Sequence, residues 1–180
     1  FYNYASESHL PQKYLPKLSD TDGKIHIVYE GGVSGANGKH RDFSDQFVSL
    51  AQHGFVLHIF PAKYDVQLSE YFNNYPNIRY YQPVVPQFLI ETMTQFNFGI
   101  IPWNLQKGNE RFLASTIANK LFEYLAAGLP VATADIKSYR DFFRDNPVGI
   151  TFKSIGELVS KNSEIQEIAK VVNKDRPIFT

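Results

Sequence analysis

Residues 115–131 read STIANKLFEYLAAGLPV, and they predict a helix that leads directly into a buried strand. Ser115 or Thr116 can cap the start of the helix, and Gly128 can end it before Pro130 opens the strand. Apolar side chains recur between these points at steps of three and four residues, the spacing of one helix face. A helix followed at once by a buried strand is a repeating unit of α/β proteins.

The same alternation extends outward on both sides of this stretch. Short apolar, β-branched or aromatic runs predict six strands, at 24–30, 55–61, 78–82, 98–103, 130–134 and 149–152. Helical spacing lies between them, at about 40–53, 65–74, 86–95, 116–127, 137–144 and 154–160, with one more helix at about 163–173. The sequence therefore predicts an α/β fold, a Rossmann-like doubly wound parallel sheet of about six strands with helices on both faces.

The pattern also divides the chain into three parts. Residues 1–23 show neither period and are expected to form an interdomain linker or arm. Residues 24–162 carry the alternation and form the predicted α/β domain. Residues 163–180 are the predicted C-terminal helix and tail.

Composition excludes several classes of function. The 180 residues include 18 Lys and Arg, 18 Asp and Glu, and no Cys. A formal net charge of zero argues against a general nucleic-acid binder, and the lack of Cys excludes disulfides, thiolate zinc sites and cysteine nucleophiles. No apolar run reaches the roughly 18–20 residues of a transmembrane helix. We expect a soluble, cytoplasmic protein, and a chain that begins at Phe1 is expected to be a piece of a longer one.

The loop after the first predicted strand, Glu30–Lys39, is the first candidate ligand site. It contains four glycines, which let backbone amides approach an anion, and a helix follows it. In an open α/β sheet, ligands bind beyond the carboxyl ends of the strands, where the strand order reverses. The loop fits neither the Walker A nor the GxGxxG pattern, so NAD binding is disfavoured, and a plain surface turn is the alternative.

Lys120 and Glu123 form the second candidate, near the start of the helix quoted above. They lie one turn apart, so both side chains can point to the same neighbourhood. A Lys can meet a phosphate as a point charge, and a carboxylate can accept two ribose hydroxyls. On spacing alone, a solvated ion pair between the two side chains is the alternative.

The run Asn119–Val131 resembles the signature of the carboxyl-terminal domain of GT-B glycosyltransferases of the large family 4 group. The likeness extends over about residues 24–160 and includes the Phe-Gly-Ile-Ile-Pro strand at 98–102. The resemblance implies that this domain is the C-terminal half of a GT-B fold and holds the nucleotide-sugar donor. It places Lys120 at the donor phosphates and Glu123 at the ribose hydroxyls.

By the same resemblance, Gly31 and Gly32 lie under the diphosphate. Many relatives carry two Glu eight positions apart, and the first position here is Ser115. Many also have an Arg where this chain has Gly32, so Lys39 or Arg41 would supply the charge instead. The candidate nucleotide-sugar-binding residues are Gly31, Gly32, Lys39, Ser115, Thr116, Asn119, Lys120 and Glu123. The departures leave the sugar and the retaining or inverting outcome open, and they also permit an inactive member.

The expected function is donor binding in a glycosyltransferase of the hexosyltransferase type, with a glycan, lipid or small-molecule acceptor. Backbone amides and Lys120 would stabilise the leaving diphosphate, so no metal or other cofactor is expected. The acceptor pocket and any catalytic base would belong to an amino-terminal domain, and the fragment would be inactive alone. Any peripheral membrane contact would be made through that other half. The alternatives are a non-catalytic nucleotide-binding or interaction module and, third, a sugar-nucleotide epimerase.

Three further signals are discounted. The Asp20-Thr21-Asp22 run precedes the first strand and is interpreted as turn chemistry rather than as a metal motif. The five His show no metal-ligand spacing, and His26 and His58 are interpreted as buried packing partners. The Trp103-Asn104 pair either borders the ligand or, more plainly, caps the core.

Overall fold

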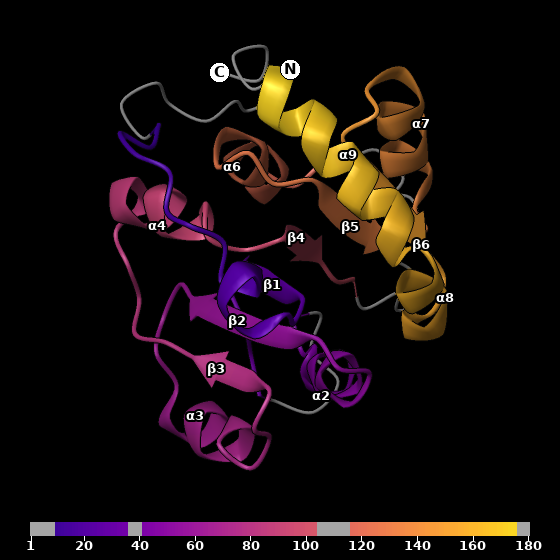
Figure 1. Cartoon of the computed structure of the whole chain (residues 1–180). Helices are drawn as coiled ribbons and strands as arrows, with labels where there is room; N and C mark the ends of the chain where they lie inside the picture. The colour runs from indigo at the N-terminus through magenta and orange to yellow at the C-terminus, as the bar shows by residue number, and fades with distance from the viewer. Residues whose placement is uncertain (1–9, 36–40, 104–115, 176–180) are drawn as a thin grey trace.

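All six strands run parallel in one sheet, in the order β3-β2-β1-β4-β5-β6 (Figure 1). The structure is a computed structural model that describes residues 10–35, 41–103 and 116–175. The strands are β1 His26–Gly31, β2 Val56–Pro61, β3 Ile78–Tyr80, β4 Phe98–Ile101, β5 Val131–Ala134 and β6 Gly149–Phe152. The helices in the described residues are α1 Ser19–Asp22, α2 Ser44–Gln52, α3 Val66–Phe72, α4 Pro86–Met93, α6 Lys120–Ala126, α7 Lys137–Asp145, α8 Ile155–Ser160 and α9 Asn162–Asp175.

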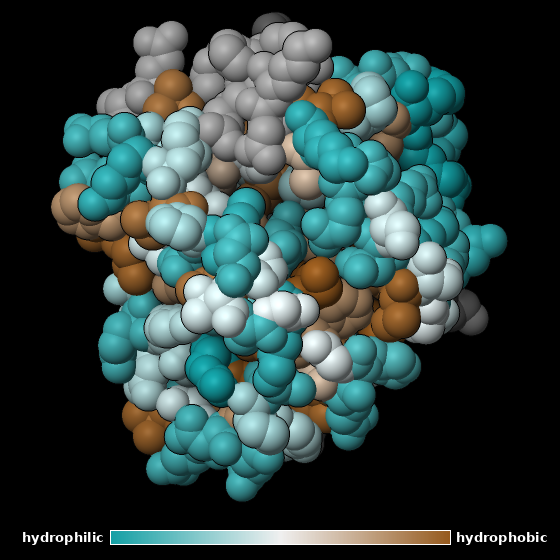
Figure 2. Space-filling view, viewed as in Figure 1, coloured by the Kyte–Doolittle hydropathy of each residue, from teal (hydrophilic) through white to brown (hydrophobic). Residues whose placement is uncertain are grey.

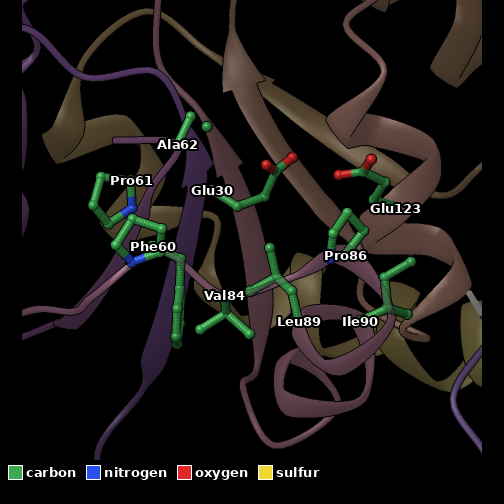
Figure 3. A pocket seen from close by; sticks show the side chains of 11 residues that line it. Glu30, Phe60, Pro61, Ala62, Val84, Pro86, Leu89, Ile90 and Glu123 are labelled. Carbon is green, nitrogen blue, oxygen red and sulfur yellow. The ribbon is translucent and has the colours of Figure 1, made fainter. Parts of the chain in front are cut away.

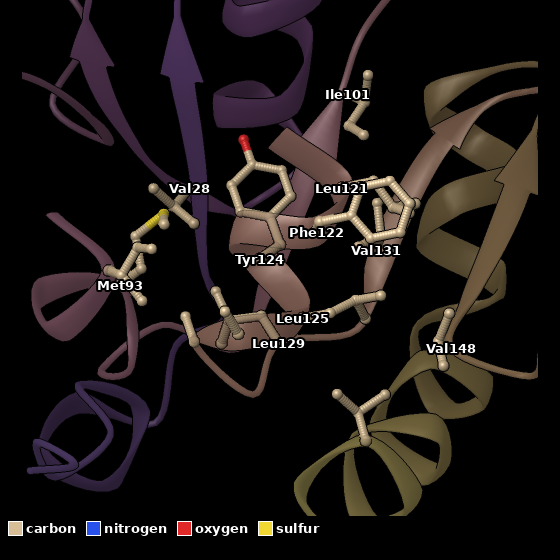
Figure 4. Packing of buried hydrophobic residues seen from close by; sticks show 14 of the residues in the cluster. Val28, Met93, Ile101, Leu121, Phe122, Tyr124, Leu125, Leu129, Val131 and Val148 are labelled. Carbon is tan, nitrogen blue, oxygen red and sulfur yellow. The ribbon is translucent and has the colours of Figure 1, made fainter. Parts of the chain in front are cut away.

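The helices cover both faces of the sheet, and each face has its own apolar core. Helices α4, α6 and α7 pack on one face, where Val28 of β1 and Met93 of α4 meet Leu121 and Tyr124 of α6 (Figure 4). Helices α2, α3 and α8 pack on the other face. Successive β1 residues alternate between the two cores, as the two-residue period of a strand requires. The predicted α/β, doubly wound parallel sheet is therefore confirmed.

Each observed strand lies within, or one residue from, its predicted run, whereas three helices differ from the prediction. Helix α2 begins at Ser44, about four residues later than expected. The one-turn helix α1 lies inside the segment that the sequence interpreted as an irregular arm. Helix α6 begins at Lys120 rather than at residue 116. Two side chains of α7 explain the late start, because the Ser138 hydroxyl donates to Thr116 O at 3.0 Å and the Ala118 amide donates to the Tyr139 hydroxyl at 2.8 Å. These tertiary hydrogen bonds hold residues 116–118 outside the helix.

The strand order reverses beside β1. The chain moves outward from β1 through β2 to β3, and then returns to place β4 on the other side of β1. The ladder between β1 and β4 is short and pairs Ile27 with Phe98 and Val28 with Gly99. Beyond it lie the carboxyl ends of the two strands, the usual ligand position in open α/β sheets.

Hydrophilic residues dominate the face of the molecule shown in Figure 2, and hydrophobic residues appear there in small separate groups. In the described residues, no helix has both the length and the apolar character that crossing a bilayer requires.

Candidate functional site

Gly31, the last residue of β1, opens the candidate site at the carboxyl edge of the sheet. Its φ of +115° lies in the region that side chains rarely adopt. A Cβ at this position would stand 2.9 Å from Nζ of Lys120. Glycine therefore meets two needs here, since it permits the turn and leaves room for the ammonium group beside the strand end.

Lys120 reaches this turn from the first position of α6. Its Nζ donates a hydrogen bond to the carbonyl of Glu30 at 2.7 Å and lies 4.1 Å from the centroid of the Tyr29 ring. Burial lowers the pKa of the Lys120 ammonium to about 8, against the charges of Glu30 and Glu123, which raise it. Within the described residues, Nζ makes this one hydrogen bond and no ion pair. Two of its three N–H groups therefore have no acceptor among the described residues.

Two buried tyrosines hold the strand end in place. The Tyr29 hydroxyl donates to the carbonyl of Gly32 at 2.7 Å. The Tyr124 hydroxyl accepts from the amide of Glu30 at 3.0 Å and donates to the carbonyl of Ile100 at 3.2 Å, so it bridges β1 and β4. Gly99 of β4 lies against the Tyr124 ring, which occupies the space that a side chain there would need.

Arg41 supplies a second cation at the glycine turn. Its guanidinium packs directly against Gly32, in the space that a Cβ would fill. A backbone hydrogen bond of 3.0 Å from the Ser34 amide to the Arg41 carbonyl brings the two ends of the loop together. Of the two cations proposed from sequence to replace the missing Arg, Arg41 is therefore adjacent to the turn, and Lys39 lies outside the described residues.

A pocket of about 210 Å³ lies beside this turn (Figure 3). Its walls come from the end of β2, the segment between β3 and α4, and α4 itself. The lining residues are Glu30, Gly31, Phe60, Pro61, Ala62, Pro83, Val84, Pro86, Leu89, Ile90 and Glu123. Only two of them, Glu30 and Glu123, have ionisable side chains, and their carboxyl groups face one another (Figure 3).

Glu30 is the more perturbed of these two acids. Burial, together with the charge of Glu123 and a hydrogen bond with it, raises the pKa of the Glu30 carboxyl group to about 8. The ammonium of Lys120 acts in the opposite direction. At neutral pH, the Glu30 carboxyl group is therefore mostly protonated.

The structure brings together four of the residues predicted from sequence, namely Gly31, Gly32, Lys120 and Glu123. Thr116 and Asn119 precede α6 instead of lining the pocket, because Thr116 is tied to α7 through its carbonyl. Lys39 and Ser115 lie outside the described residues.

Sequence reasoning missed Glu30, Tyr29 and Tyr124. One signal was present for Glu30, which directly precedes the glycines at the end of an otherwise apolar strand. The roles of the two tyrosines depend on contacts across the sheet, for which the sequence holds no local sign.

Two of the histidines, the Asp20–Asp22 run and Trp103, which were discounted above as metal or ligand sites, make structural contacts. His26 and His58 are 6% and 4% exposed, and Nδ1 of His26 lies 2.8 Å from Nε2 of His58. Asp22 ends the short helix α1 before Gly23, whose φ is +72°, and it pairs with His26. Trp103 packs against the core near Tyr139. No group of three or more potential metal-ligating side chains occurs in the described part of the chain.

The sequence matches one family model, described as "Glucosyltransferase 3-like, C-terminal domain", over residues 41–175. No curated protein matches it. Among solved structures, WaaG, a glycosyltransferase involved in lipopolysaccharide biosynthesis, is 13% identical with a TM-score of 0.59, and the match covers 98% of this chain and 51% of WaaG. The GtfA/B complex is 13% identical with a TM-score of 0.60, over 94% of this chain and 34% of that one.

The pneumococcal O-GlcNAc transferase GtfA, solved with UDP and GlcNAc, is 14% identical with a TM-score of 0.53. That match covers 94% of this chain and 36% of the transferase. The chain thus spans about a third to a half of the length of these structures. They confirm the fold expected for the carboxyl-terminal half of a GT-B glycosyltransferase.

Proposed function

The chain belongs to the family of Glucosyltransferase 3-like C-terminal domains, and from this premise we propose that it binds the nucleoside-diphosphate sugar donor of a glycosyltransferase. One observation carries the proposal. A glycine turn and a lysine ammonium group meet where the strand order of the sheet reverses. This combination suits a diphosphate, because the turn admits close approach and the ammonium neutralises charge.

The pocket beside the turn supports a role for the rest of the nucleotide. Glu123 borders the pocket from α6, and its carboxylate can accept the two ribose hydroxyls. The remaining walls are mainly apolar, with Phe60, Val84 and Pro86 among the lining residues, so a nucleobase would bury its faces there. We assign the phosphates to Gly31 and Lys120, the ribose to Glu123 and the base to the apolar walls.

In this proposal the chemistry is transfer of a hexose to an acceptor. Lys120 and the adjacent Arg41 would stabilise charge on the leaving diphosphate, and a metal ion is not required for that task. The acceptor and any general base are assigned to a further domain, and the described chain is proposed to be inactive alone. UDP is the natural first probe, because a structure of this fold was solved with it.

The test compares UDP, GDP and ADP binding to the chain by isothermal titration calorimetry, with Glu123→Ala as the variant. Loss of a charged hydrogen-bonding partner costs about 1.5–3 kcal/mol, so the best nucleotide should bind roughly 10- to 100-fold more weakly to the variant. The 2′-deoxy form of the same nucleotide should bind more weakly than the parent to the unmodified chain, and equally to the variant.

Glu70→Ala, on the exposed face of α3, is the matched control and should leave binding unchanged. Failure of all three nucleotides to bind would refute the donor-site proposal. Binding that still discriminates the 2′-hydroxyl in Glu123→Ala would refute the ribose assignment alone.

A further inference from the structure

The proposed donor site contains a second carboxyl group, that of Glu30, to which the proposed function assigns no role. Its side chain lines the pocket from the end of β1, and the Glu123 carboxyl group faces it from α6 (Figure 3). Its backbone is fixed twice, because Lys120 binds its carbonyl and Tyr124 binds its amide. The Glu30 side chain therefore extends from a fixed backbone position beside the turn assigned to the diphosphate.

The surroundings of Glu30 disfavour its ionised form. The facing side chains from β2 and α4 are apolar, namely Phe60, Leu89 and Ile90. Helix α6 contributes the Glu123 carboxyl group, the Lys120 ammonium group and the Tyr124 hydroxyl, and β1 contributes Tyr29. Burial keeps both phenols neutral by raising their pKa, and Arg41 lies beyond them at Gly32. Two carboxylates and a diphosphate would thus crowd negative charge around the Lys120 and Arg41 cations.

We propose that Glu30 is a specificity-determining residue of the donor site, acting as a neutral carboxylic acid that donates a hydrogen bond to the Glu123 carboxylate and must be protonated for a nucleoside diphosphate to bind. This inference rests on the proposed function. Protonated Glu30 orients the Glu123 carboxylate toward the ribose hydroxyls and removes a charge that would repel the diphosphate. Ionised Glu30 does neither, so the pair favours binding at neutral pH over binding at alkaline pH.

The proposal predicts the direction in which UDP affinity changes with pH. The pKa of Glu30 is about 8 in the free chain, and a bound diphosphate would raise it further. Binding then takes up a proton, and UDP affinity falls above pH 8 by up to about tenfold for each pH unit. At pH 8 the terminal phosphate of UDP is already fully ionised, since such groups titrate at about pH 6.

The experiment measures proton uptake on UDP binding at pH 8, by calorimetry in two buffers of different ionisation enthalpy. For the unmodified chain, Glu30 should contribute a fraction of a proton, since it is partly protonated before binding and fully protonated after it. Glu30→Gln should reduce this uptake and flatten the fall in affinity between pH 8 and 9. Glu70→Gln, the exposed control on α3, should match the unmodified chain.

Lys120 also titrates near pH 8, but it cannot imitate this result. The Glu30 charge favours the ammonium form, so its removal lowers the pKa of Lys120 and increases the proton uptake at that residue. If UDP still binds Glu30→Gln, a proton uptake that is unchanged or larger than in the unmodified chain would overturn the proposal. Failure of UDP, GDP and ADP alike to bind the unmodified chain would instead refute the proposed function.

A measurement on the unmodified chain covers the case in which Glu30→Gln does not fold. Side-chain carboxyl ¹³C resonances of Glu are followed against pH, with and without UDP. One Glu should titrate near pH 8 and move to higher pH with UDP. Titration of every Glu below about pH 6 would overturn the proposal.

Discussion

At the scale of single residues, Gly31 sets both the backbone turn at the end of β1 and the position of the Lys120 ammonium group. Gly31→Ala would force a side chain into a left-handed conformation and move the Lys120 ammonium, which lies 2.9 Å from the new Cβ. Strain of this kind costs about 1–3 kcal/mol, so we expect the free energy of unfolding to fall by that amount. We also expect weaker UDP binding, because Lys120 loses its position. Urea unfolding and calorimetry measure the two effects.

Gly156→Ala is the matched control for Gly31→Ala. Gly156 lies in α8, where a Cβ would have no neighbour closer than 3.9 Å. This change should stabilise the chain by about 0.4–1 kcal/mol and leave UDP binding unchanged. Equal stability changes at the two glycines would show that the turn at Gly31 is not strained against Lys120.

At the scale of elements, the Tyr124 hydroxyl joins β1 to β4 just beyond their short ladder. Tyr124→Phe keeps the ring packed on Gly99 but leaves the Glu30 amide and the Ile100 carbonyl without this partner. Unmet buried hydrogen-bonding groups cost about 1–3 kcal/mol, and we expect that loss of unfolding free energy. Amide hydrogen exchange should quicken at Glu30 more than in β5 or β6.

Tyr71→Phe tests whether any tyrosine hydroxyl would have this effect. Its hydroxyl accepts a bond from Tyr75 on the exposed surface, so its removal should change stability by less than about 0.5 kcal/mol. A Tyr124→Phe variant as stable as the Tyr71→Phe variant would contradict the bridging role.

The elements were predictable because most signals for them are local. Near-continuous apolar runs gave the buried strands, and Pro130 and Gly128 marked a boundary that the structure keeps. The start of α6 was not predictable, since it depends on hydrogen bonds from α7 to residues 116–118. Local propensity yields to such tertiary contacts.

The candidate site was predictable only in part, for a related reason. Gly31, Lys120 and Glu123 were found because a glycine loop and a helix motif each carry a pattern in sequence. Glu30 and Tyr124 act through groups about 90 residues away, and no spacing rule joins positions so far apart. The glycine turn marked the place, but the carboxyl pair across the pocket emerged only with the fold.

At the scale of the whole molecule, the buried pair His26 and His58 ties stability to pH. Burial, together with the charges of His26 and Arg79, lowers the pKa of His58 to about 3. As pH falls below about 6.5, the unfolded chain binds a proton at His58 and the folded chain does not. His58 therefore costs the folded state about 2 kcal/mol between pH 7 and pH 5.

His58→Gln removes this titration. Urea unfolding at pH 7 and pH 5 should show that the unmodified chain loses about 2 kcal/mol more than the variant over this interval. The prediction concerns the difference between the two proteins, because the raised pKa of Glu30 acts in the opposite direction over the same range. His53→Gln, on the exposed end of α2, should behave as the unmodified chain. Parallel pH dependences for His58→Gln and the unmodified chain would contradict the role of His58.

The central claim is that the carboxyl edge of the sheet, between β1 and α6, binds a nucleoside diphosphate. The most direct measurement is a titration of the ¹⁵N-labelled chain with UDP, followed through its backbone amide resonances. The account predicts saturable shifts centred on Gly31, Gly32, Lys120 and Glu123, with none at Gly54 on the opposite edge of the sheet. No saturable shift with UDP, GDP or ADP, or shifts centred on the opposite edge, would contradict it.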